Sequence, residues 1–267
     1  MKNLPNYFTL LNLVAGCIAI VLSLQTNNIS IYIADDGVSS FNIPENLSLA
    51  ALFLYAAGVI DFLDGFVARC FKVSSDMGKQ LDSLADVVSF GVAPGVLLFQ
   101  LLRMSYLREE NGLDTSVWVL MPVFIYTAAA AFRLAKFNLD TRQTSSFRGV
   151  PTPAAGLLVA SFPLILHADS SFPIINEWLV NKWFLYGIAF LLAWLMVCDL
   201  PLWALKFTNN KPALNLPRIL VLIVAMVAAL LLHWLAVPVL FVLYILISII
   251  FKPTSHVIHS TGESNAA

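Results

Sequence analysis

The chain has 267 residues, of which 59% are hydrophobic, with a mean hydropathy of +0.83 and a formal net charge of −1. This apolar share exceeds the roughly 45–50% of soluble domains and predicts an integral membrane protein. The near-neutral charge gives no basic surface for nucleic acid, which argues against a nucleic-acid partner. Cys17, Cys70 and Cys198 show neither metal-site spacing nor an evident disulfide pairing.

The apolar segments predict an all-α bundle of about eight transmembrane helices, because a spanning helix needs about 20 apolar residues. We expect these helices near residues 8–25, 47–71, 79–103, 116–138, 152–168, 183–206, 213–231 and 235–251. With no internal repeat and no soluble domain, residues 1–252 are predicted to form a single transmembrane catalytic domain. The polar tail, 253–267, is expected to be disordered.

The distribution of lysine and arginine predicts the orientation in the membrane. With the N-terminus inside, twelve of the 15 basic residues fall at cytoplasmic helix ends, and the outer side holds Arg103, Arg108 and Lys182. The N- and C-termini are therefore predicted to be cytoplasmic.

The first predicted helix carries a polar stripe. Asn6, Thr9 and Asn12 are spaced by three residues, and Gly16 follows four residues later, so all four share one helix face. Residues 13–17 resemble a lipoprotein cleavage site, but the stripe interrupts the apolar run of a signal peptide, so we expect no cleavage. The stripe either lines a polar cavity or bridges neighbouring helices, as Asn and Thr often do in membranes.

Four carboxylates lie on the next two predicted helices. Asp61 and Asp64 share one face of the second helix, and Asp82 and Asp86 lie one turn apart on the third. Charge within a membrane is costly and is usually functional. Oxygen ligands suit hard cations, so two Mg²⁺ or Mn²⁺ ions at this point would clamp a phosphoryl group.

These segments read D-x-x-D-G-x-x-A-R, eight residues, then G-x-x-x-D-x-x-x-D. The pattern resembles the signature of the CDP-alcohol phosphotransferases at all eight of its positions: Asp61, Asp64, Gly65, Ala68, Arg69, Gly78, Asp82 and Asp86. Small residues at three of them leave space for a ligand, and Arg69 offers a planar fork for phosphate. The resemblance implies that the aspartates bind the metals, with Asp86 also the candidate general base. It also implies that Gly65, Ala68, Arg69 and Gly78, with Asn6, Thr9 and Asn12 from the first helix, bind the CDP-diacylglycerol.

Further blocks resemble the phosphatidylserine synthases within this family. They include P-N-x-x-T-x-x-N near the N-terminus, the run from Gly78 to Pro94, F-R-L-A-K-F-N at 132–138 and F-R-G-V-P-T-P-A-A-G at 147–156. This resemblance covers roughly residues 3–165. It implies transfer of the phosphatidyl group of CDP-diacylglycerol to the hydroxyl of L-serine, giving phosphatidylserine and CMP. It also implies a homodimer.

A serine acceptor brings a carboxylate that needs a basic partner. Arg133 and Lys136 lie one turn apart near the cytoplasmic end of the fourth predicted helix, and Arg148 lies in the following loop. A bidentate arginine suits a carboxylate. The alternative is that these residues only anchor the helix at the headgroups.

Two other functions remain open from the sequence. One is a family member with another acceptor, such as glycerol 3-phosphate or an inositol phosphate, although these phosphates favour a denser basic cluster. The other is a cation transporter, which needs polar residues across the whole bilayer and often repeated halves. A bacterial inner membrane with a cytoplasmic active site is the expected location. The sequence leaves the choice between Mg²⁺ and Mn²⁺ and the role of Asp199 open.

Overall fold

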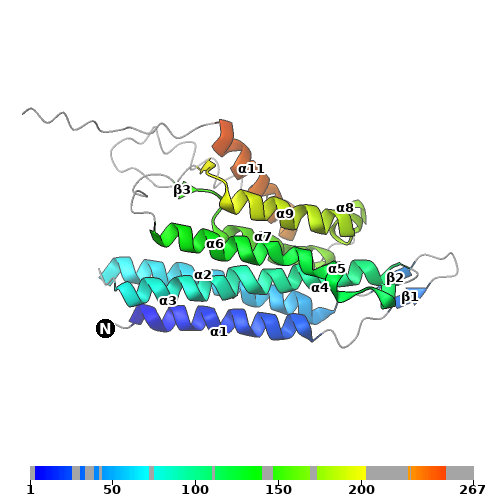
Figure 1. The fold of residues 1–267 in the computed structure, drawn as a ribbon, viewed down its shortest axis with the longest axis horizontal. Coiled ribbons are helices and arrows are strands. Elements are labelled where there is room, and N and C mark those ends of the chain that lie inside the picture. Colours follow the sequence, from blue (N-terminus) through cyan, green and yellow to red (C-terminus); the bar gives the residue numbers. More distant parts are fainter. Residues whose placement is uncertain are drawn as a thin grey trace, which may run out of the picture.

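The computed structural model describes residues 4–25, 31–33, 39–41, 44–71, 75–109, 112–139, 147–168, 173–202, 228 and 230–250. The elements within these ranges form a helical bundle whose longer helices run side by side (Figure 1). The predicted seventh helix, 213–231, lies almost wholly outside the described residues, as does the tail 253–267.

The first three predicted helices form one side of the bundle. They are α1 (Leu4–Leu24), α2 (Glu45–Phe71) and a continuous helical run made of α3 (Asp76–Asp86), η1 (Val87–Val92) and α4 (Ala93–Leu107). η1 is a π-helical turn, which the sequence did not predict. Helix α1 packs along α2 and also contacts α3, η1 and α4. The N-terminal end of α1 and the start of α3 lie at the same end of the bundle (Figure 1).

The fourth predicted helix is a composite of α5 (Val117–Leu120), the 3₁₀ turn η3 (Met121–Phe124) and α6 (Ile125–Leu139). Pro122 lies at the start of η3, where its missing N–H is tolerated. A short 3₁₀ turn, η2 (Gly112–Asp114), precedes this composite. Helix α7 (Thr152–Ala168) has the predicted bounds and contacts α2, α4 and η1.

The sixth predicted helix, 183–206, is corrected by the structure. A short helix α8 (Pro173–Leu179) is followed, at a bend of 68°, by α9 (Lys182–Val197). The Asn181 side chain caps α9 by accepting from the backbone N–H groups of Trp183 and Phe184. Beyond α9 the chain is extended and forms β4 (Pro201–Leu202), because Pro201 has no N–H for a helical bond.

Strand β4 pairs with β3 (Phe147–Arg148), with Arg148 opposite Pro201. Gly149, which follows β3, has φ +75°, and a Cβ there would lie 2.6 Å from the carbonyl oxygen of Met196. This close approach requires glycine and fastens the segment before α7 to the end of α9.

The remaining described elements are short or terminal. β1 (Ile31–Ile33) and β2 (Ser39–Phe41) pair antiparallel within the predicted outer loop. The 3₁₀ turn η5 (His233–Leu235) leads into α11 (Ala236–Ile250), which packs against α7. The all-α prediction therefore holds for the bundle but misses two small strand pairs.

Five described helical stretches are long and apolar enough to cross a bilayer: Pro5–Leu24, Glu45–Phe71, Asp76–Leu107, Val117–Leu139 and Leu230–Ile249. The bent pair α8–α9 would make a sixth, and α7 is a shorter apolar helix of 17 residues. The prediction of a helical membrane protein is confirmed, whereas the count of eight stays a prediction.

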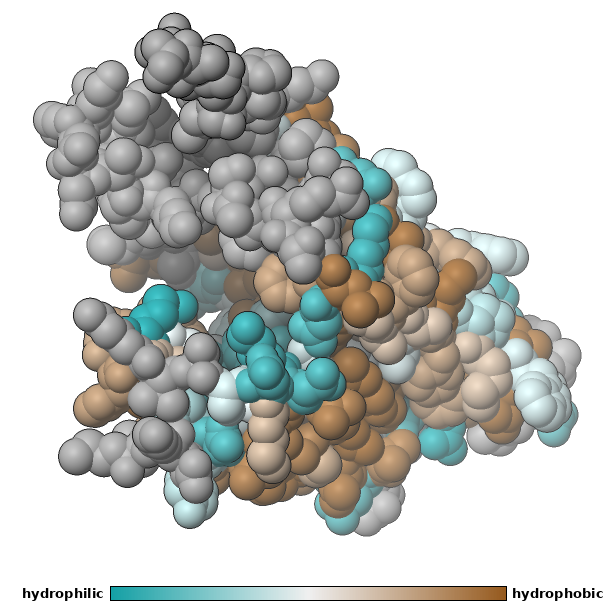
Figure 2. All heavy atoms as spheres, turned by 60° about the vertical axis from the view of Figure 1, so that its left-hand side comes forward, coloured by the Kyte–Doolittle hydropathy of each residue, from teal (hydrophilic) through white to brown (hydrophobic). Residues whose placement is uncertain are grey.

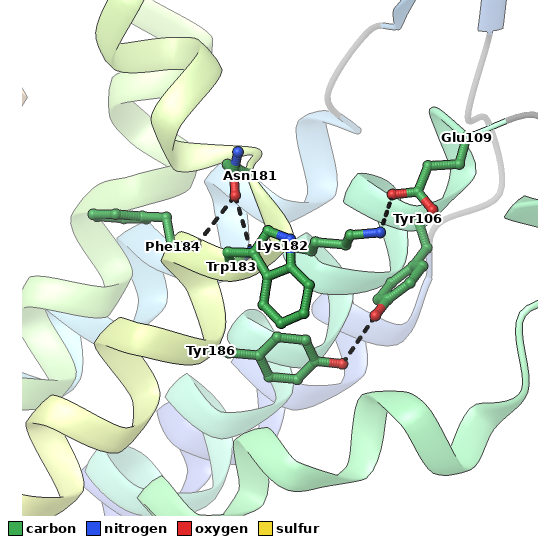
Figure 3. Close-up of polar contacts among 7 residues, drawn as sticks. All are labelled: Tyr106, Glu109, Asn181, Lys182, Trp183, Phe184 and Tyr186. Carbon is green, nitrogen blue, oxygen red and sulfur yellow. Dashed lines mark hydrogen bonds and ion pairs between the residues drawn. The ribbon is translucent and has the colours of Figure 1, made fainter.

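The end of the bundle opposite the N-terminus is held by a polar and aromatic cluster (Figure 3). The ammonium of Lys182 pairs with Glu109 and lies 4.9 Å from the centre of the Tyr106 ring. The hydroxyls of Tyr106 and Tyr186 are 3.3 Å apart, and that of Tyr186 donates to the carbonyl of Val119. These contacts join the ends of α4, α5 and α9.

Helix α1 approaches η1 closely at Gly16. A Cβ at Gly16 would lie 2.5 Å from the Ser89 hydroxyl oxygen and 2.8 Å from the Ser89 Cα, so backbone would have to shift. We expect Gly16→Ala to destabilise the protein by about 1–3 kcal/mol, the usual effect of overpacking. Thermal unfolding in detergent micelles measures this.

Gly187 provides the matched control, because a Cβ there meets nothing within 4 Å. Gly187→Ala is expected to leave the unfolding temperature unchanged or raise it, since alanine favours a helix by about 0.8–1.0 kcal/mol. Equal unfolding temperatures for the two variants would contradict the close contact of α1 with η1.

Candidate active site

A cavity of about 360 Å³ opens where α1, α2 and α3 meet, at the N-terminal end of the bundle. Figure 2 looks onto this end, where hydrophilic residues gather between apolar ones. The cavity is lined by Pro5, Asn6, Thr9, Asp61, Phe62, Asp64, Gly65, Ala68, Arg69, Ser75, Gly78, Lys79 and Asp82. Helices α1, α2 and α3, with the N-cap residue Ser75 of α3, therefore supply all of its lining.

Three of the four predicted metal-binding aspartates converge. One carboxylate oxygen each from Asp61, Asp82 and Asp86 lies within 4.8 Å of the others. Asp61 comes from α2, whereas Asp82 and Asp86 lie one turn apart on α3, and Asp86 is only 8% exposed. Three close carboxylates repel one another unless a cation joins them, and their hard oxygens suit Mg²⁺ or Mn²⁺. The residues present therefore fit a divalent metal.

Asp64 lies beside this group without belonging to it. Its carboxylate lines the same cavity, is 7% exposed and accepts a hydrogen bond from the Thr9 hydroxyl. It is close enough to Asp61 and Asp82 for the charges to interact. A metal role for Asp64 stays a prediction, because Asp64 is not one of the three described carboxylates that converge.

The polar stripe of α1 faces the carboxylates. Asn12 donates from Nδ2 to Oδ1 of Asp86 over 3.4 Å, and the backbone carbonyl of Asn12 accepts from the Ser89 hydroxyl at 3.0 Å. The Oδ1 of Asn12 is buried and has no hydrogen-bond partner among the described residues. Thr9 and Asn12 thus bridge helices, the alternative considered from the sequence, while Asn6 and Thr9 also line the cavity.

The small residues of the pattern leave space in the cavity. A Cβ added at Gly65 would lie 3.4 Å from a guanidinium nitrogen of Arg69, and one at Gly78 would lie 3.3 Å from Oδ1 of Asn6. Ala68 and Arg69 line the cavity with them. Glycine at 78 therefore permits the close approach of α1 and α3 at the cavity.

Sequence reasoning missed several residues that line this cavity. Ser75 caps α3 by accepting the N–H of Gly78 at 3.0 Å, and Lys79 follows Gly78. A serine three residues before Gly78 at a predicted helix start was a usable capping signal. Lys79 was counted only among the basic residues that set orientation, although its position beside Gly78 placed it at the site.

The structure separates the three predicted acceptor-binding residues. Arg133 is 8% exposed, donates from Nη1 to the hydroxyl of Thr152 at 2.9 Å, and is close enough to Asp86 for their charges to attract. Its Nε is buried without a partner in the described part of the chain. Lys136 instead pairs with Asp199 at 2.9 Å on the exposed surface. The backbone of Arg148 lies in β3, but its side chain is outside what the structure describes.

The fold and this cavity define a polytopic helical membrane protein with an acidic site at one end of the bundle. The family model described as CDP-alcohol phosphatidyltransferase matches residues 2–200. The chain therefore belongs to the CDP-alcohol phosphatidyltransferase family, as its motif predicted.

Among its relatives, a CDP-diacylglycerol–serine O-phosphatidyltransferase of Methanocaldococcus jannaschii is 30% identical over 74% of this chain and 72% of that relative. One of Bacillus subtilis is 36% identical over 45% of this chain and 66% of the relative. An archaetidylserine synthase of Methanothermobacter thermautotrophicus is 32% identical over 60% of this chain and 58% of the relative. The chain thus spans between 58% and 72% of the length of these relatives.

Proposed function

We propose that this protein transfers the phosphatidyl group of CDP-diacylglycerol to the hydroxyl of L-serine, giving phosphatidylserine and CMP. The observation that carries the proposal is the group formed by Asp61, Asp82 and Asp86 beside a cavity built from the family pattern. The names of the three relatives, all of which specify serine, support the choice of acceptor.

The cavity residues have complementary tasks in this reaction. The diphosphate of CDP-diacylglycerol would lie in the cavity, where Gly65 and Gly78 leave space and Arg69 and Lys79 provide positive charge. Mg²⁺ or Mn²⁺, in two sites held by Asp61, Asp82 and Asp86 with Asp64 as a further ligand, would supply charge neutralisation on the phosphates.

Asp86 is the proposed general base. It takes the proton of the serine hydroxyl as the serine oxygen bonds to the phosphorus that carries diacylglycerol, and the bond from that phosphorus to the CMP oxygen breaks. Asn12 donates to one carboxylate oxygen of Asp86, which orients the carboxylate. The burial of Asp86 shields the proton transfer from bulk water.

Arg133 is the proposed partner of the serine carboxylate. It is buried, lies near Asp86 and keeps an unpartnered Nε within the described structure. We expect Arg133→Ala to raise the KM for serine about 10- to 150-fold, because a charge-assisted hydrogen bond contributes about 1.5–3 kcal/mol. The KM for CDP-diacylglycerol should change far less. Steady-state kinetics with each substrate varied in turn measures both values.

Lys136→Ala is the matched control, since Lys136 lies one turn away and forms an exposed ion pair with Asp199. Exposed pairs contribute little, so this variant is expected to retain both KM values. An equal rise in both KM values in Arg133→Ala would indicate that Arg133 is structural or binds the diphosphate. If neither KM value changes in Arg133→Ala, Arg148 is the next residue to test as the partner of the serine carboxylate.

The acceptor is tested by competition between alcohols. Purified protein in detergent with CDP-diacylglycerol is given labelled serine, glycerol 3-phosphate or inositol phosphate, and lipid products are separated. Labelled phosphatidylserine with release of CMP is expected only with serine. Product from a phosphorylated acceptor would instead support the other family activity, and no product from any alcohol would reject the proposed reaction.

The proposed topology has eight spans within one transmembrane domain, 1–252, with both termini and the cavity cytoplasmic. Its support is the position of the cavity at the N-terminal end of α1, with Arg69 and Lys79, whereas Lys182 lies at the opposite end. A bacterial inner membrane and a homodimer complete the proposal. A cation transporter is disfavoured because the grouped carboxylates lie at one end of the bundle in the described structure.

A further inference from the structure

A π-helical turn begins directly after Asp86. In η1 the N–H of Ala93 donates to the carbonyl of Val88, five residues earlier. Such turns are rare and occur frequently at functional sites. Each contains one residue more than an α-helical turn, so the helix before it is rotated by about 100° relative to a continuous α-helix. This rotation lies between the carboxylates of α3 and the buried helix α4.

Side chains of α6 bond to the carbonyls of this turn. Pro94 has no N–H, so it cannot donate to the carbonyl of Phe90 in the α-helical pattern. The hydroxyl of Tyr126, a fully buried residue, donates to that carbonyl at 2.8 Å. The Thr127 hydroxyl donates to the next carbonyl, of Gly91, at 3.0 Å.

Two other helices hold the same turn. The Ser89 hydroxyl donates to the backbone of α1 at Asn12. On the side of α7, a Cβ at Gly156 would lie 3.1 Å from the Cβ of Phe90, so α7 packs closely against the turn. The turn is therefore fixed by contacts from α1, α6 and α7, and its conformation sets which way Asp82 and Asp86 face.

We propose that Tyr126 is a positioning residue for the metal-binding group. Its bond to the Phe90 carbonyl holds η1 in the π form and thereby keeps Asp82 and Asp86 turned toward Asp61. This inference rests on the metal site of the proposed function. Without the hydroxyl, the Phe90 carbonyl loses the donor that Pro94 cannot replace, so the turn shifts and the carboxylates of α3 turn away from Asp61.

Tyr126→Phe tests the inference, because it removes the hydroxyl and keeps the ring. Binding of Mn²⁺ to the purified protein without substrate is measured by electron paramagnetic resonance, together with the thermal unfolding temperature. We expect Mn²⁺ to bind about 5- to 150-fold more weakly, the range set by leaving one buried carbonyl without its donor.

Tyr55→Phe is the matched control. The Tyr55 hydroxyl also donates to a backbone carbonyl between helices, at 3.0 Å, but this carbonyl belongs to Leu157 of α7 and not to η1. This variant is expected to lower the unfolding temperature while Mn²⁺ affinity stays at the wild-type value. Wild-type Mn²⁺ affinity in Tyr126→Phe would overturn the inference, even if that variant unfolds at lower temperature.

If Tyr126→Phe does not fold, variants of Thr127 test the inference instead. Thr127→Ala, which removes the second hydroxyl, should weaken Mn²⁺ binding, whereas Thr127→Ser should retain it. Equal Mn²⁺ affinity in these two variants would overturn the inference. Failure of the wild-type protein to bind Mn²⁺ would overturn both this inference and the metal site of the proposed function. If the wild type binds Mn²⁺ and the variants bind it with the same affinity, only this inference is overturned.

Discussion

Asp86→Asn is expected to lower kcat by about 10²- to 10⁴-fold, the usual contribution of general acid–base catalysis. The substitution keeps the size of the side chain but removes the group that accepts the serine proton. Asp86 is buried and accepts from Asn12, whereas the neighbouring Asp61 and Asp82 are assigned to the metal alone, so neither is expected to replace it as the base. Release of CMP from CDP-diacylglycerol and serine measures kcat.

Because Asp86 also belongs to the metal-binding group, binding of CDP-diacylglycerol is measured separately with the same variant. Asp76→Asn is the matched control: Asp76 lies in the exposed first turn of the same helix and does not line the cavity in the described structure. Its kcat should equal that of the wild type. A near-normal kcat for Asp86→Asn would remove Asp86 from the catalytic residues.

Removal of divalent metal is expected to abolish turnover, with activity falling about 10³-fold or more. Metal ions contribute several kcal/mol of charge stabilisation to phosphoryl transfer, and each 1.36 kcal/mol is a factor of ten in rate. The repulsion among Asp61, Asp82 and Asp86 makes the empty group a poor binding site for a diphosphate. EDTA treatment followed by an assay of CMP release measures the loss.

Addition of Mg²⁺ or Mn²⁺ should restore turnover, and comparison of the two identifies the more effective ion. EDTA already saturated with Mg²⁺ is the control for effects of the chelator itself, and it should leave the rate unchanged. Full turnover in metal-free buffer would reject the metal-binding role of the aspartates.

The sequence predicted the helices of the bundle well where apolar length alone decides. Helix α7 has the predicted bounds, and α2 begins two residues earlier than predicted. The breaks within the third and fourth helices were not predicted, because a π turn and a 3₁₀ turn at Pro122 do not interrupt an apolar run. The sixth helix was predicted too long for the same reason, since apolar residues continue through Pro201. Helix α8 was missed because it lies before polar Asn181 and Lys182, outside the predicted sixth helix.

The candidate site could be predicted in part because its residues follow a fixed spacing. Asp61, Asp82 and Asp86 meet as the helical periodicity indicated. The pairing of Thr9 with Asp64 and that of Lys136 with Asp199 depend on how separate helices are placed, which spacing within one helix does not determine. The sequence left the role of Asp199 open, and the contact with Lys136 gives this residue a structural partner.

The cavity lining ends at Asp82, whereas Arg133 and Thr152 come from later helices. On the proposed assignment, the donor substrate is handled by the first third of the chain and the acceptor by its middle. Recognition of the donor and recognition of the acceptor can therefore be changed separately by protein engineering. Exchanging the part of α6 from 133 to 139 and the start of α7 for those of a relative that uses another alcohol, with Tyr126 and Thr127 retained, should redirect the product while nucleotide recognition remains untouched.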